Sequence, residues 1–108
     1  KTEQAAQHYL QQQGLTFLTG NYRWPGGEID LVMQDADTLV FVEVRYRSNP
    51  HFADALASIN QRKQRRLILT AQHYLQRHRW SGACRFDVVG IDGQQHCTWI
   101  KNAFMANS

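Results

Sequence analysis

The spacing of apolar residues predicts a helix at the start of the chain. Ala6, Tyr9 and Leu10 recur at helical intervals within residues 3–13. Gly14 follows directly, and glycine is the residue that most often ends a helix. We therefore expect the first helix to cover residues 3–13.

The pattern then changes to that of a β-hairpin. Strand-forming residues fill 15–24, a Pro-Gly-Gly turn occupies 25–27, and residues 28–33 alternate. The alternation places residues on two faces: Ile29, Leu31 and Met33 on one, and Glu28, Asp30 and Val32 on the other. The second strand of this hairpin is thus predicted to carry its carboxylates on one face.

Residues 39–47 have the strongest strand pattern in the chain. One face carries Val40, Val42, Val44 and Tyr46, and the other carries Leu39, Phe41, Glu43, Arg45 and Arg47. Charged residues therefore begin halfway along a strand whose apolar content is typical of the protein interior.

A long helix is predicted after a break at residues 48–50. Its stripe recurs every three or four positions from 52 to 78, through Phe52, Leu56, Ile59, Lys63, Leu67, Ala71, Tyr74 and His78. Two further strands, 85–91 and 96–101, flank an Asp92-Gly93 turn. The order αβββαβ, with one additional strand, predicts an α/β fold in which a mixed sheet is flanked by two helices. With 108 residues we expect a single domain over 1–108 and one core.

Composition excludes several classes of protein. At 43% hydrophobic and 19% charged residues the chain is not typical of a disordered protein, and it lacks the run of about 20 apolar residues that a membrane helix needs. No secretory signal pattern opens the sequence, so we expect a cytoplasmic protein with no membrane partner. Cys84 and Cys97 are predicted at staggered hairpin positions, so we expect no disulfide and no thiolate metal site.

Positive charge is concentrated in one segment. The chain has a net charge of +3, but the residues between His51 and Trp80 carry six Lys or Arg against one Asp, a net charge of +5. The cluster Arg62, Lys63, Arg65 and Arg66 is at its centre. This distribution suits contact with a polyanion such as nucleic acid, and the alternative is a helix face that is simply solvated.

Asp30 and Glu43 are the candidate site. Each lies in a predicted strand among apolar residues, and neighbouring hairpin strands can place them side by side. Two buried carboxylates need a compensating cation. Mg²⁺ binds proteins through one or two carboxylates and completes its shell with water and phosphate oxygens. The alternative is a structural ion pair with Arg45 or Arg23.

The sequence also resembles a known family over nearly its whole length. The matching segments are residues 3–10, 21–23, 27–32, 41–47, Lys63, 85–89 and 102–104, among which GEIDLV and FVEVR are highly specific. They resemble the YraN family, uncharacterised bacterial proteins similar to nucleases. The spacing of Asp30 and Glu43-Val44-Arg45, with twelve residues between, resembles the metal-site motif of the PD-(D/E)xK nuclease superfamily.

The resemblance implies a restriction-endonuclease-like fold related to Holliday-junction resolvases. It implies Asp30 and Glu43 as ligands of Mg²⁺ or Mn²⁺, with the Val44 carbonyl as a third ligand and Glu3 as an additional helical acid. The chain departs from the motif at Arg45, where lysine is usual. A guanidinium stays protonated and cannot act as general base, although it can hold a phosphate oxygen. Lys63 is then the candidate for a substitute base.

Several of these residues have a structural alternative. Lys63 interrupts an apolar helical stripe, so its stem can pack there while the ammonium reaches water. Arg45 and Arg47 can be edge-strand charges. Glu28 can be an exposed acid at the start of a strand. Asp87 is either a partner of the metal site or an ion-pair partner of Arg85.

Three functions remain open on these grounds. The first is a metal-dependent endonuclease acting on DNA, including branched DNA, with Arg23, Arg47, Arg62, Arg65 and Arg66 on the nucleic acid. The second is a non-catalytic nucleic-acid-binding module with the nuclease fold, which the change to Arg45 favours. The third is a protein-interaction adaptor, for which the sequence contains no specific motif.

Analogy with resolvase-like enzymes suggests a homodimer. Trp24, Trp80 and Trp99 are expected to pack in or at the rim of the core rather than to stack on bases, and no histidine is assigned a role.

Overall fold

The computed structural model describes residues 2–47 and 52–106. The elements are α1 (Thr2–Gln12), β1 (Thr16–Trp24), β2 (Gly27–Asp35), β3 (Thr38–Tyr46), α2 (Phe52–Ala57), α3 (Gln61–Arg77), β4 (Cys84–Ile91) and β5 (Cys97–Phe104). The break predicted at residues 48–50 lies outside the described residues. In the described part of the chain no helix is both long and apolar enough to span a bilayer.

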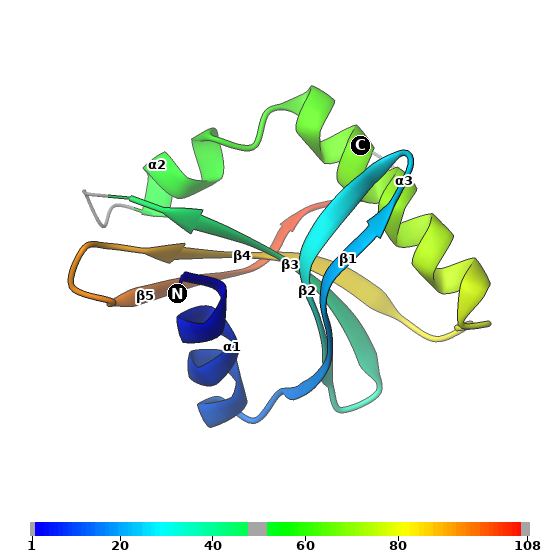
Figure 1. The fold of residues 1–108 in the computed structure, drawn as a ribbon, viewed down its shortest axis with the longest axis horizontal. Helices are drawn as coiled ribbons and strands as arrows, with labels where there is room; N and C mark the ends of the chain where they lie inside the picture. The colour runs from blue at the N-terminus through cyan, green and yellow to red at the C-terminus, as the bar shows by residue number, and fades with distance from the viewer. Residues whose placement is uncertain (1, 48–51, 107–108) are drawn as a thin grey trace.

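The five strands form one mixed sheet in the order β1-β2-β3-β4-β5. All neighbours are antiparallel except β3 and β4, which are parallel. A parallel pair cannot be joined by a tight turn, and here α2 and α3 supply the crossover. Figure 1 shows α1 on one side of the sheet and α2 and α3 on the other. The predicted α/β fold with a mixed sheet between helices is confirmed.

The sheet divides the apolar interior into two clusters, so the expectation of one core is wrong. Ala6 and Leu10 of α1 pack with Val40, Val42 and other residues on one face of the sheet. Residues of α2 and α3 pack against the opposite face, with Leu39, Phe41, Phe86 and Val88 among the strand residues. A continuous sheet that is covered on both faces separates two cores. The alternation predicted for β3 is confirmed, because Leu39 and Phe41 belong to one cluster and Val40 and Val42 to the other.

The single helix predicted over 52–78 is two helices in the structure. Asn60 caps α3: its side chain accepts a hydrogen bond from the Lys63 backbone N–H at 2.9 Å. The buried Ile59 lies between the two helices and still contributes to the core. The apolar stripe therefore continues across the break between α2 and α3, and the sequence pattern does not show where one helix ends and the next begins.

The face assignment of β2 changes at Asp30. Ile29 and Val32 pack in the cluster beneath α3, whereas Leu31 and Met33 pack in the cluster beneath α1. The strict alternation predicted for this strand is therefore wrong at its start. In β1, Asn21 lies between the partners of Leu31 and Ile29, and it has a positive φ of 51°. A left-handed residue in one strand locally changes the twist of the pair.

The β1–β2 turn docks tightly on α3. The Trp24 indole N–H donates to Thr70 Oγ1 at 2.8 Å, and the Thr70 hydroxyl donates to the Arg66 carbonyl at 2.9 Å. Gly27 lies against this pair with a φ of 151°, and a Cβ there would come within 2.9 Å of Thr70 Oγ1. This contact fixes the start of β2, and hence Asp30, relative to α3.

Gly27→Ala is expected to destabilise the fold by about 1–3 kcal/mol, because it combines a strained φ with an overlap at Thr70. The measurement is the free energy of unfolding in urea. Gly20→Ala is the control, because a Cβ at Gly20 meets only ordinary contacts at 3.6 Å or more. Equal losses for the two variants would contradict the role given to the turn.

Candidate active site

Asp30 lies where β2 and β3 stop pairing. The last paired residues of the two strands are Leu31 and Val42. Beyond this pair the Asp30 side chain takes the place of a backbone acceptor between the two strands, because its Oδ2 accepts a hydrogen bond from the Val44 backbone N–H at 2.8 Å. The carboxyl group is therefore held between two diverging strands rather than on an open sheet face.

Glu43 follows on β3 and is almost fully buried, with 6% of the residue exposed. Lys63 of α3 places its Nζ 3.1 Å from Glu43 Oε2. The Arg45 guanidinium is more distant, at 3.8 Å from the same oxygen. A buried carboxylate of this kind is compensated here by one close cation and one more remote cation.

Asp30 and Glu43 are close enough to perturb each other. Burial is the largest cause that raises the pKa of Asp30, followed by the negative charge of Glu43. The hydrogen bond from the Val44 N–H opposes both, yet the pKa of Asp30 still rises from its usual 3.8 to about 6. A carboxyl pair with this titration behaviour is typical of sites that bind a cation or move a proton.

Glu3 brings α1 into the same cluster. Burial and the charge of Asp30 raise the pKa of the Glu3 carboxyl, and a hydrogen bond with Asn21 opposes the rise. Asn21 is also the residue with positive φ in β1. Asn21 was not among the predicted site residues. Asparagine tolerates positive φ better than most residues, so an asparagine within a predicted strand was the feature of the sequence that could have pointed to this position.

The donor set suits a hard divalent cation but does not by itself complete a metal site. Asp30 and Glu43 offer two carboxylates, the number that Mg²⁺ often takes from a protein. Glu3 interacts with Asp30, and Asp30 interacts with Glu43, in each case through charge and a side-chain hydrogen bond. Among the described residues, however, no three His, Cys, Asp or Glu side chains converge as a group that could hold a metal. The remaining ligands would have to come from backbone, water or substrate oxygens.

Other predicted residues lie elsewhere. Arg23 pairs with Glu28 at 3.1 Å on the surface, so Arg23 is not the counter-ion of Asp30 or Glu43. The Arg85 Nε–H donates to Asp87 Oδ1 at 3.0 Å. Of the two alternatives for Asp87, the structure therefore shows the ion pair with Arg85. Asp87 also accepts hydrogen bonds from the Trp99 indole N–H and the Asn102 backbone N–H, each at 2.9 Å. Cys84 and Cys97 are both free thiols, as expected.

Arg45 and Arg47 are not fully exposed edge charges. Both are half-buried near the end of β3. The Nε of Arg45 is shielded from solvent and has no hydrogen-bond partner within the described part of the protein. An unsatisfied buried donor costs about 1–3 kcal/mol, which makes Arg45 a group with unused hydrogen-bonding capacity beside Glu43.

The arginines Arg62, Arg65 and Arg66 are all exposed on the first two turns of α3. With Lys63 they put four cations at the end of a helix whose dipole is already positive, and no acid lies in its first turn. Lys63 is offset by Glu43, whereas the three exposed arginines are unfavourable beside the positive end of the helix dipole.

Comparison with known proteins places the chain in a family. The model of uncharacterised protein family UPF0102 matches residues 2–91. The chain belongs to family UPF0102. A UPF0102 protein of Coxiella burnetii is 54% identical over 103 residues, covering 94% of this chain and 86% of the relative. One from Janthinobacterium is 56% identical over 104 residues, covering 96% and 84%.

A UPF0102 protein of Pseudomonas putida is 54% identical over 108 residues, covering 94% of this chain and 88% of the relative. The prediction of an uncharacterised bacterial family is thus confirmed at the level of UPF0102. The family description carries no activity, so nuclease chemistry and the PD-(D/E)xK superfamily belong to the proposal below.

The raised pKa of Asp30 predicts a pH dependence of stability. Because the folded state holds the proton more tightly, the free energy of unfolding should fall as pH rises from about 4 to about 6. With about 1.4 kcal/mol per pKa unit, the fall is at most about 3 kcal/mol. Asp30→Asn keeps an acceptor for the Val44 N–H and should lose this dependence. Glu28→Gln is the control, and urea unfolding at several pH values is the measurement. Parallel profiles for wild type and Asp30→Asn would refute the assignment.

Proposed function

We propose that this UPF0102 protein is a metal-dependent endonuclease that hydrolyses DNA phosphodiesters, including those of branched DNA. The proposal also assigns it to the PD-(D/E)xK superfamily, with Mg²⁺ or Mn²⁺ as cofactor. The observation that carries it is the pairing of a half-buried Asp30 with a buried Glu43 on adjacent strands, with Lys63 Nζ at 3.1 Å from Glu43 Oε2. A homodimer, by analogy with resolvase-like enzymes, is part of the proposal.

In this proposal Asp30 and Glu43 hold the cation through their carboxylate oxygens. The further oxygen donors in this proposal are the Val44 carbonyl, next to Glu43 in the chain, and Glu3, which is hydrogen-bonded with Asp30. When bound, a divalent cation would supply Lewis-acid polarisation of the phosphate and of the attacking water. Its positive charge would also oppose the burial and the repulsion from Glu43 that raise the pKa of Asp30, and so favour the ionised Asp30 carboxylate.

Lys63 and Arg45 have different roles because their chemistry differs. An ammonium can give up its proton when its surroundings favour this, whereas a guanidinium cannot. Lys63 is therefore the candidate base: its ammonium would first have to release its own proton, and the neutral amine could then accept one from the nucleophile. Arg45, with its unsatisfied Nε, is suited to hold a phosphate oxygen and stabilise developing charge.

The surface around the pair supports a nucleic-acid substrate. Arg62, Arg65 and Arg66 are on α3 within one turn of Lys63, and they are exposed at a helix end that repels cations. Phosphates bound there would turn an unfavourable arrangement into a favourable one. Arg23 of β1 and Arg47, directly after β3, complete the proposed binding surface.

A second candidate is a non-catalytic nucleic-acid-binding module. Two observations favour it: lysine of the nuclease motif is replaced by Arg45, and Glu43 is already neutralised by Lys63 and Arg45. In that case the acids and cations form a structural network, and α3 alone carries the interaction with nucleic acid.

The decisive measurement is cleavage of labelled linear duplex and four-way-junction DNA with Mg²⁺ or Mn²⁺. We expect Asp30→Asn and Glu43→Gln to lower the rate by about 100-fold or more, because each removes a charge that holds the cation. Asp37→Asn removes an exposed carboxylate in the turn between β2 and β3 and should leave the rate unchanged. A wild type that binds the DNA but cleaves none of it with either metal would leave the binding module as the function.

Arg45→Lys separates the two candidates further. If Arg45 stabilises charge at the phosphate, the lysine restores the usual motif residue and should keep or raise the cleavage rate. If Arg45 is only a counter-ion, the variant should bind DNA normally, cleave nothing, and lose about 1 kcal/mol of stability. Cleavage assays and thermal unfolding of the same two proteins distinguish these outcomes.

A further inference from the structure

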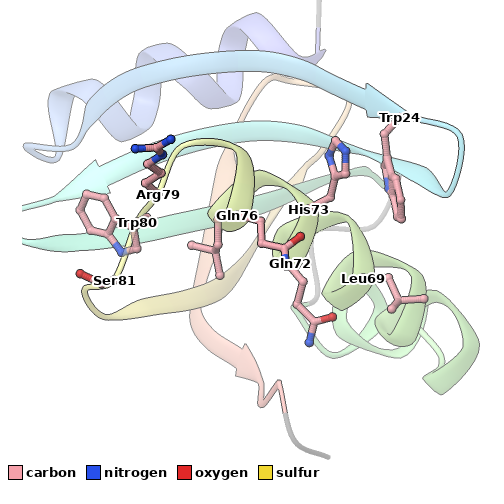
Figure 2. A pocket seen from close by; sticks show the side chains of 9 residues that line it. Trp24, Leu69, Gln72, His73, Gln76, Arg79, Trp80 and Ser81 are labelled. Carbon is pink, nitrogen blue, oxygen red and sulfur yellow. The ribbon is translucent and has the colours of Figure 1, made fainter.

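A groove of about 660 Å³ runs along the exposed side of the C-terminal half of α3, away from the acid pair. Figure 2 shows its lining side chains following the helix and the segment after it, with Trp24 reaching in from the end of β1. The volume is that of sites which bind one or two ring systems.

The groove has a mixed lining of apolar, amide and cationic groups. Leu69 is 52% exposed at one end, Gln76 lies in the middle, and Arg79 and Trp80 lie at the other end. None of the described residues that line it is acidic. Amide and guanidinium groups beside aromatic rings are the groups that contact the faces and edges of unpaired bases.

The aromatic part of the wall is rigid. The His73 ring stacks on Trp24 with 4.5 Å between ring centroids and 20° between ring planes. His73 Nδ1 also lies 2.6 Å from the Tyr22 hydroxyl oxygen. The Trp24 indole N–H is bonded to Thr70 and that of Trp80 to the Ala83 carbonyl. The tryptophans thus pack at the core rim, as expected, and His73 is held in one orientation on the groove wall.

The groove adjoins the cationic surface that is proposed to bind nucleic acid. Trp24 lines both this groove and a second, polar hollow at the β1–β2 turn, where Arg23 and Arg66 lie. Arg66 is one turn from Lys63, which contacts Glu43. From Lys63 to His73 the helix rises about 15 Å. A strand bound near the acid pair can therefore extend along α3 into the groove.

Arg79 has an unusual backbone conformation for its residue type. It follows the end of α3 with a φ of 53°, its N–H donates to the Gln76 carbonyl at 3.2 Å, and the Trp80 N–H donates to the Leu75 carbonyl at 2.9 Å. Glycine is the residue favoured in this helix-terminating position. The chain instead places a cationic side chain there, on the rim of the groove.

The geometry points to a binding site for an unpaired strand of nucleic acid in this groove, with bases against His73 and Leu69 and a phosphate on Arg79. This inference rests on the proposed function, because it names the form of substrate that the same surface would take. Base faces and Watson–Crick edges are accessible only in an unpaired strand, whereas a duplex presents mainly phosphates to such a wall. The protein would then prefer substrates with a single-stranded branch or overhang.

The test compares binding of a fluorescent single-stranded oligonucleotide with that of a blunt duplex, in EDTA so that no cleavage occurs. Leu69→Glu places a negative charge in the groove, and Arg79→Gly removes the cation while relieving the positive φ. We expect each to weaken single-strand binding about five- to tenfold and duplex binding less than twofold. Arg79→Gly should also unfold at a higher temperature than wild type, so its loss of binding cannot come from unfolding.

Two control variants carry the same charge changes outside the groove. Gln11→Glu adds a negative charge on α1, on the other side of the sheet, and Arg77→Ala removes a cation from the last turn of α3. Both should change single-strand binding less than twofold. Equal effects of Arg77→Ala and Arg79→Gly, equal losses for single strand and duplex, or no loss in either groove variant would each overturn the inference.

Cleavage of a blunt duplex and of an overhang substrate with Mg²⁺ or Mn²⁺ separates this inference from the proposed function. If the nuclease proposal fails, no substrate is cut, but the binding comparison in EDTA still decides the groove. If only the groove inference fails, the groove variants cut both substrates at the wild-type ratio. Both proposals are supported if the wild type cleaves the overhang substrate faster than the blunt duplex, and if Leu69→Glu and Arg79→Gly each reduce this preference.

Discussion

Burial of the Glu43 carboxylate in the middle of β3 is the constraint on which the arrangement of this protein depends. A strand that carries an ionised acid into the interior is stable only if a cation reaches it from a neighbouring element. Lys63 of α3 supplies this cation. The crossover therefore has to bring the first turns of α3 over the carboxyl end of β3. Asp30 increases the demand, because a second carboxyl group lies beside the first.

Several energetically unfavourable features are concentrated around this pair. The carboxyl group of Asp30 has a raised pKa, the Nε of Arg45 lacks a partner among the described residues, and cations crowd the positive end of α3. Proteins keep such local conflicts mainly at functional sites, where a ligand relieves them. A divalent cation and a phosphate backbone would relieve all three at once, by neutralising the acids, accepting from Arg45 and pairing with the arginines.

The surroundings of the site are, by contrast, well satisfied and rigid. Trp24, Thr70 and Gly27 lock the β1–β2 turn to α3, so the hairpin that carries Asp30 and the helix that carries Lys63 move as one unit. On the other half of the sheet, Asp87 accepts from Arg85, Trp99 and Asn102 and joins β4 to β5 without unpaired groups. This contrast separates a structural buried acid from a candidate functional one, since Asp87 has every partner it needs.

The sequence by itself determined the elements, the mixed sheet with helices on both sides, and the pairing of Asp30 with Glu43 on adjacent strands. These follow from periodicity, turn residues and the short range of hairpin contacts. It did not determine the division of the interior into two cores or the end of α2 before Asn60, because an apolar stripe is the same in one helix or two. Nor did it give the change of face at Asp30, which depends on the left-handed Asn21 in the neighbouring strand.

Only the tertiary structure decided which cation reaches which acid. Arg23 and Arg45 were the candidates nearest in the sequence, yet Arg23 pairs with Glu28 and Lys63 approaches Glu43 more closely than Arg45 does. The groove beside His73 was likewise invisible in the sequence, because its walls come from β1, α3 and the segment that follows it. Contacts between residues distant in the chain are set by how the crossover helix packs on the sheet, and no local pattern encodes that packing.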